Sequence, residues 1–161
     1  MKSASFATKT PLQDMINAES KNNYSADDQV ELIRLEAVNP DTNAKVALFE
    51  SYLILGKWKQ SDFVASASCL LDSSNVEQSK ILGDLWVKNI NKVAKSFDRD
   101  YFLAYFRNLK TSFLADKEHL SKLVYYTNAL KNDPKFATRI KLMREEAEHL
   151  EIIMAIKESD Y

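Results

Sequence analysis

Glycine and proline are scarce in this chain, which has two glycines and three prolines in 161 residues. Hairpins of β-sheets depend on turn pairs such as Asn-Gly, Asp-Gly or Gly-Gly, and the sequence contains none of these pairs. Hydrophobic residues make up 45% of the chain and charged residues 28%, which is ordinary for a globular protein. These features predict an all-α fold in a single domain over residues 1–161, with residues 1–9 as a flexible N-terminus.

Residue types that commonly carry catalysis or bind metals are also few, with one cysteine and two histidines. A lone cysteine excludes an intrachain disulfide, and with two separated histidines it cannot by itself complete a tetrahedral zinc site. Glu146 and His149 form one E-x-x-H motif, whereas a di-iron site needs two such motifs and two further glutamates. We therefore expect both residues on a solvated charged face, and we expect no catalytic residue, metal or cofactor. A helical metalloenzyme or ligand-binding bundle is the contrasting class.

Neither sign of charge is in excess, because 22 basic residues stand against 23 acidic ones. Nucleic-acid-binding domains usually carry a basic surplus, so this balance argues against nucleic acid as a partner. No run approaches the roughly 18 apolar residues of a membrane-spanning helix, and the N-terminus lacks the apolar segment of a signal peptide. These absences predict a cytoplasmic protein without a membrane span.

Capping residues and helix breakers divide the chain into helices that come in pairs. Ser25, Ser74, Asp98 and Asp116 each precede an apolar periodic segment, and such side chains accept hydrogen bonds from the free N–H groups of a first helical turn. We expect seven to nine helices in four antiparallel pairs, which cover residues 11–38, 42–72, 75–113 and 117–157.

One glycine, Gly56, follows a helix expected to end near Leu55 and precedes Trp58, which is expected to begin the next helix. A left-handed residue at a helix end costs glycine least, so we expect Gly56 at positive φ in a tight turn, with Trp58 largely buried. The spacing of Leu48, Tyr52, Gly56 and Trp58 matches a degenerate tetratricopeptide repeat. The sequence thus predicts a tetratricopeptide-like right-handed helical array, with an irregular helical bundle as the alternative.

In a tetratricopeptide hairpin, the first helix of each pair lines the concave face. The inward positions of the helix before the glycine turn map onto Asn43, Val46, Glu50, Leu53 and Ile54. Three of these are apolar, which suits the apolar face of a guest helix better than an acidic peptide. Leu53→Asp should then abolish binding and leave the fold intact. Alternatively, another helix of the same chain covers these residues, and Leu53→Asp should unfold the protein.

The segment DYFLAYFRNLKTSF, residues 100–113, concentrates aromatic side chains. Phe102, Tyr105 and Phe106 follow the spacing of a core-facing helix. Tyr101 falls outside this stripe, so we expect it to extend an apolar patch outward and to be the second candidate for partner contact.

The phrase LFESYLILGKW, residues 48–58, is similar to the core LFELL-x-x-LGDW of the ImpE/TagJ family, accessory proteins of bacterial type VI secretion systems. In that family the phrase follows an x-x-P-x-D linker, whose place is taken here by Val38 to Asp41. A later segment, residues 119–148, resembles the family's second helix pair, with His119 at its usual tryptophan. The resemblance covers roughly residues 10–72 and 117–150, and residues 97–110 have no counterpart in it.

The resemblance implies an adaptor without catalytic activity. Family members bind an amphipathic helix of the small subunit of the contractile sheath, and they are linked to the unfoldase that recycles sheaths. The expected partners are therefore that small subunit and, indirectly, the unfoldase. The alternative is a generic tetratricopeptide-like chaperone or scaffold of another complex.

Overall fold

The computed structural model describes residues 25–109 and 116–159. Every regular element in these ranges is a helix, and no strand occurs among them, so the predicted all-α fold is confirmed. Residues 1–9, which were expected to form a flexible N-terminus, and residues 11–24, which were expected to belong to the first helix pair, lie outside the described residues. The elements are α2 (Ala26–Ala37), α3 (Thr42–Tyr52), α4 (Gln60–Leu70), α5 (Val76–Ser96), α6 (Arg99–Leu109), α7 (Lys117–Leu130), the 3-10 helix η2 (Pro134–Phe136) and α8 (Ala137–Ser159).

Three of the four predicted caps are in place. The Ser25 hydroxyl accepts from the Asp28 N–H, and the Asp28 carboxylate accepts from the Ser25 N–H, which makes a reciprocal capping box. Asp98 accepts from the Tyr101 N–H, and Asp116 accepts from the His119 N–H. The prediction for Ser74 is wrong, because the neighbouring Asn75 caps α5 by accepting from the Gln78 N–H.

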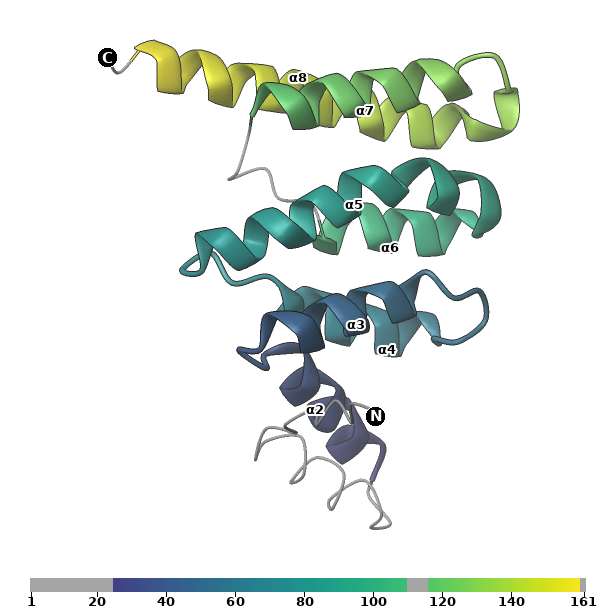
Figure 1. Ribbon diagram of the computed structural model, residues 1–161. Coiled ribbons are helices and arrows are strands. Elements are labelled where there is room, and N and C mark those ends of the chain that lie inside the picture. The colour runs from purple at the N-terminus through teal and green to yellow at the C-terminus, as the bar shows by residue number, and fades with distance from the viewer. Residues whose placement is uncertain (1–24, 110–115, 160–161) are drawn as a thin grey trace, which may run out of the picture.

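The helices form antiparallel pairs that are stacked on one another (Figure 1). The pairs are α3 with α4, α5 with α6, and α7 with α8, and α2 packs below the first pair. Helix α5 packs between α3 and α7, while α4 packs between α2 and α6, and α6 also contacts α8. The stack therefore has two layers, one of α3, α5 and α7 and the other of α2, α4, α6 and α8.

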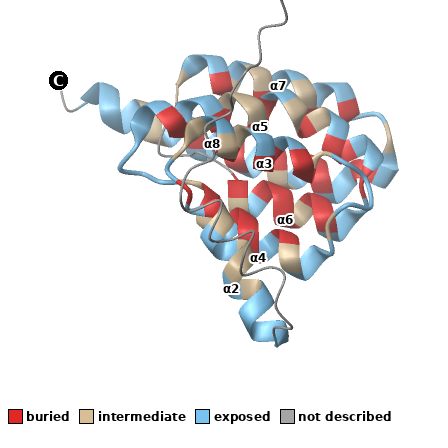
Figure 2. Ribbon diagram, turned by 60° about the horizontal axis from the view of Figure 1, so that its bottom comes forward, coloured by how far each residue is buried: buried red, intermediate tan, exposed pale blue. Residues whose placement is uncertain are grey.

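The core lies between these two layers, where the buried residues gather (Figure 2). Aromatic rings link the first two pairs: the Phe63 ring of α4 stacks on Tyr101 of α6 with centroids 4.5 Å apart, and Tyr101 stacks on Phe97 at 4.7 Å. The prediction that Tyr101 extends an outward patch is wrong, because only 7% of its surface is exposed. In α6, the predicted core stripe of Phe102, Tyr105 and Phe106 and the neighbouring Tyr101 are therefore all buried in the core.

Tyr101 also donates a hydrogen bond from its hydroxyl to the Tyr52 carbonyl at the end of α3, at 2.8 Å. Arg139 of α8 donates from its guanidinium to the Phe97 carbonyl at the end of α5, at 3.0 Å. Each donor is the third residue of the second helix in its pair, and each acceptor ends the first helix of the preceding pair. The last carbonyls of a helix lack partners within it. A hydrogen bond to such a carbonyl therefore joins the second pair to the first, and an equivalent bond joins the third pair to the second.

A buried lysine closes the first pair in a related way. Lys45 of α3 is 2% exposed, and its ammonium donates to the Leu70 carbonyl at the end of α4. Burial lowers the pKa of Lys45, while the nearby Asp72 opposes that shift. The contact satisfies one of the free C-terminal carbonyls of α4 and fixes α3 against it.

The turn between α3 and α4 has the predicted positive φ at Gly56, which is +76°. Helix α3 ends at Tyr52 rather than near Leu55, so Gly56 lies in the loop and not at the helix end. The Lys57 N–H donates to the Ile54 carbonyl at 3.2 Å, which makes Gly56 the third residue of a four-residue turn. That position takes positive φ in a type II turn, and glycine is favoured there.

Trp58 lies in the same loop and does not begin α4, which starts at Gln60. Its side chain is half-buried rather than largely buried. The indole N–H donates to the Ser51 hydroxyl at 3.0 Å, and the ring meets Tyr52 edge to face at 5.2 Å. Trp58 therefore fastens the loop to the end of α3.

Tyr101→Phe should lower the free energy of unfolding by about 1–2 kcal/mol, because the Tyr52 carbonyl loses its donor inside the core. Burial raises the pKa of Tyr101, so the hydroxyl stays protonated and able to donate at neutral pH. Urea unfolding followed by circular dichroism measures the loss. Tyr125→Phe is the matched control, because Tyr125 is 69% exposed and should change stability by less than about 0.5 kcal/mol. Equal effects in the two variants would contradict the role of the hydrogen bond.

Gly56→Val should cost more than about 1 kcal/mol, because a β-branched residue is strained at positive φ. No atom lies within 4 Å of the position that a Cβ would occupy, so the cost comes from the backbone alone. Gly56→Asn should cost less, since asparagine tolerates the left-handed region. If urea unfolding showed the Gly56→Asn variant to be less stable than the Gly56→Val variant, the turn would have a different conformation in solution.

Candidate functional site

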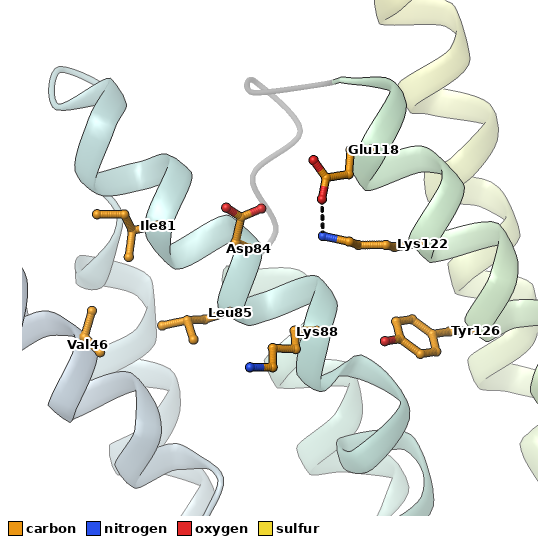
Figure 3. A pocket seen from close by; sticks show the side chains of 8 residues that line it. All are labelled: Val46, Ile81, Asp84, Leu85, Lys88, Glu118, Lys122 and Tyr126. Carbon is orange, nitrogen blue, oxygen red and sulfur yellow. Dashed lines mark hydrogen bonds and ion pairs between the residues drawn. The ribbon is translucent and has the colours of Figure 1, made fainter.

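A groove of about 570 Å³ crosses the outer side of the layer formed by α3, α5 and α7 (Figure 3). The residues on α5 recur at intervals of three and four, and those on α7 at intervals of four, so each set lies on one face of its helix. The lining residues are Val46 of α3, Ile81, Asp84, Leu85 and Lys88 of α5, and Glu118, Lys122 and Tyr126 of α7.

Apolar side chains occupy the part of the groove between α3 and α5. Val46 and Leu85 are half-buried against the core, and Ile81 is 39% exposed. Tyr126, which is also half-buried, adds an aromatic ring from α7. The next residue after Ile81, Leu82, points into the core and is 1% exposed. Helix α5 therefore buries one face and offers a second apolar stripe to the groove.

The α7 wall of the groove carries an ion pair between Glu118 and Lys122, one helical turn apart (Figure 3). The hydrogen bond from Lys122 holds the pKa of Glu118 below its usual value, and the same bond raises the pKa of Lys122. Both side chains reach solvent, so the pair contributes little to stability. Its effect is to keep these two charges engaged with each other.

Asp84 on the α5 wall faces His119, which is 5% exposed between α5 and the start of α7. The Nε2 atom of His119 lies 3.4 Å from Asp84 Oδ1, and its Nδ1 atom lies 3.0 Å from Asp116 Oδ2. Neither ring nitrogen of His119 has a hydrogen-bond partner by geometry, so the two contacts are close approaches and not hydrogen bonds. Burial raises the pKa of Asp116. The backbone N–H and the ring of His119 together lower it by more than burial raises it, so the pKa of Asp116 is below its usual value.

Of the five residues predicted from the sequence to form a groove, Val46 lines this one. Asn43 and Glu50 are exposed on α3, and Ile54 is 53% exposed in the following loop. Leu53 caps the C-terminus of α3, where it is half-buried against the core. A partner contact at these four residues stays a prediction, while the groove itself is centred on α5.

Sequence reasoning missed the groove residues of α5 and α7. In the sequence, Ile81 and Leu85 recur with Trp86, Ile90 and Val93 at helical spacing and read as one apolar face. The two groups differ in their angle around the axis of α5. Leu82, Trp86, Ile90 and Val93 share one face and are buried, whereas residues 81, 85 and 88 form a second stripe beside that face. One contact with the core needs only a narrow apolar stripe on a helix. A helix whose apolar residues cover a wider arc has enough apolar surface to pack against a second partner.

The E-x-x-H motif on α8 lies only in part on the solvated face that the sequence suggested. His149 is exposed as expected, whereas Glu146 is only 5% exposed, and His149 Nδ1 lies 3.9 Å from its Oε2 atom. Within residues 25–109 and 116–159, no three histidine, cysteine or acidic residues are grouped so that they could hold a metal ion. Across the same residues, no helix has the length and apolar character needed to span a membrane.

Comparison of the sequence with protein-family models found no match, and the searches of curated proteins and of solved structures found none either.

Two neighbouring aspartate substitutions on α5 test whether the groove is open. Ile81→Asp should lower the free energy of unfolding by less than about 1 kcal/mol, because the new carboxylate reaches water. Leu82→Asp should cost more than about 4 kcal/mol or prevent folding, because it places an unpaired charge in the core. Urea unfolding gives both values. Similar losses in the two variants would mean that Ile81 is covered and that the groove is closed.

Proposed function

We propose that this protein is a non-catalytic adaptor that binds an amphipathic helix of a partner protein in the groove of α3, α5 and α7. The observation that carries the proposal is the apolar part of this groove, formed by Val46, Ile81 and Leu85 on the outer side of a helical layer. Removal of such surface from water contributes about 25 cal/mol per Å², before the costs of ordering both partners.

The dimensions of the groove suit a helix. Packed helices lie about 8–10 Å apart, so three adjacent helices present roughly 20 Å of surface across the layer. A guest helix rises 1.5 Å per residue and would cross it with about 13 residues, or between three and four turns. A stripe at i, i+3, i+4 and i+7 on the guest would meet the apolar residues of the groove.

The partner that we propose is the small subunit of the type VI contractile sheath. The proposal follows from the resemblance of residues 48–58 to the ImpE/TagJ family, and it would place the protein in the bacterial cytoplasm with an indirect link to the sheath-recycling unfoldase. The apolar groove supports the helix-binding part of this proposal. A tetratricopeptide-like chaperone or scaffold of another complex would use the same groove for a different guest helix.

Isothermal titration of the purified protein with the sheath small subunit tests both parts. Ile81→Asp should weaken binding by roughly thirtyfold or more, since a carboxylate would be buried against an apolar stripe. Val64→Asp is the matched control: Val64 is 36% exposed on α4, in the other layer, and its substitution should leave the affinity unchanged.

Two results would count against the proposal. If Ile81→Asp binds as tightly as the unsubstituted protein, the contact lies outside this groove. If the unsubstituted protein does not bind the sheath subunit, that choice of partner is wrong.

A further inference from the structure

Four charged side chains line the groove, and three of them are already engaged. Glu118 pairs with Lys122. Asp84 lies 3.4 Å from His119, and its charge also acts on Lys122. Lys88 is different: among the described residues, no carboxylate lies within ion-pair distance of its ammonium group. The groove therefore presents one cation without a counter-charge from this part of the chain.

Lys88 lies where a guest would pass over it. It follows Leu85 by three residues and Ile81 by seven, so it shares their face of α5 and extends their apolar stripe by one turn. Figure 3 shows its side chain between Leu85 and Tyr126, next to the apolar part of the groove. A helix that covers Ile81 and Leu85 would take water away from the Lys88 ammonium.

Removing water from an unpaired ammonium is costly, and a carboxylate on the guest offsets that cost. The other charges of the groove do not offer the same opportunity, because each already has an opposite charge nearby. On this basis, and resting on the proposed function, we infer that the partner is an amphipathic helix with an acidic flank. Its apolar stripe packs on Val46, Ile81 and Leu85, and a glutamate or aspartate beside that stripe pairs with Lys88.

Two designed peptides test the inference. Each is an acetylated amphipathic helix of about 18 residues, long enough to populate helix in solution, with leucine at i, i+3, i+4 and i+7. The peptides differ only on one flank, which carries glutamate in the first and lysine in the second. Fluorescence anisotropy at low and high salt measures their affinity for the full chain.

The glutamate peptide should bind about fivefold more tightly than the lysine peptide, and salt should reduce the difference. Lys88→Glu should reverse the preference. Lys80→Glu is the matched control, because Lys80 is an exposed lysine of the same helix that does not line the groove, and its substitution changes the net charge equally. It should leave the preference for the glutamate peptide in place.

The outcomes separate this inference from the proposed function. Equal binding of both peptides, with no effect of Lys88→Glu, overturns the acidic flank and leaves helix binding intact. Equal effects of Lys88→Glu and Lys80→Glu show a general charge effect and also overturn the role of Lys88. If neither peptide binds the unsubstituted protein, helix binding by the groove is itself wrong.

Discussion

The stacking of this protein depends on how the free carbonyl groups at its helix ends find hydrogen-bond donors. The last carbonyls of a helix have no partner within the helix, and burying them without one is costly. Tyr101 supplies a donor to the end of α3, and Arg139 supplies one to the end of α5. Because each donor comes from the following pair, each pair is fixed in height and rotation against the one before it.

That fixation is what creates the groove. The donors sit on α6 and α8 and reach across to the ends of α3 and α5, so they hold the first helices of the pairs side by side in one layer. Helix α5 lies between α3 and α7 in that layer, with its core face toward α6 and a second apolar stripe facing outward. A change in the offset between pairs would separate Val46 from Ile81 and Leu85.

Much of the fold followed from local sequence rules. Three caps, the positive φ of Gly56 and the pairing of the helices from residue 42 onward were all predicted, because each is set by interactions within a few residues. The errors were of two kinds. Helix ends near Gly56 and Ser74 were misplaced by one to a few residues, since several neighbouring residues can serve as a cap or turn. Tyr101 was placed on the outside, because periodicity alone could not show that α4 packs on that side of α6.

The sequence by itself determined the all-α class, the order of the helices and the chemistry of their caps, because backbone preferences and capping hydrogen bonds act over one or two turns. Only the tertiary structure decided which apolar stripe became core and which stayed open. Leu82 and Ile81 are adjacent and equally apolar, yet one is 1% and the other 39% exposed. The difference arises from the rotation of α5 between its neighbours, which contacts distant in sequence, such as the one between Arg139 and Phe97, hold in place.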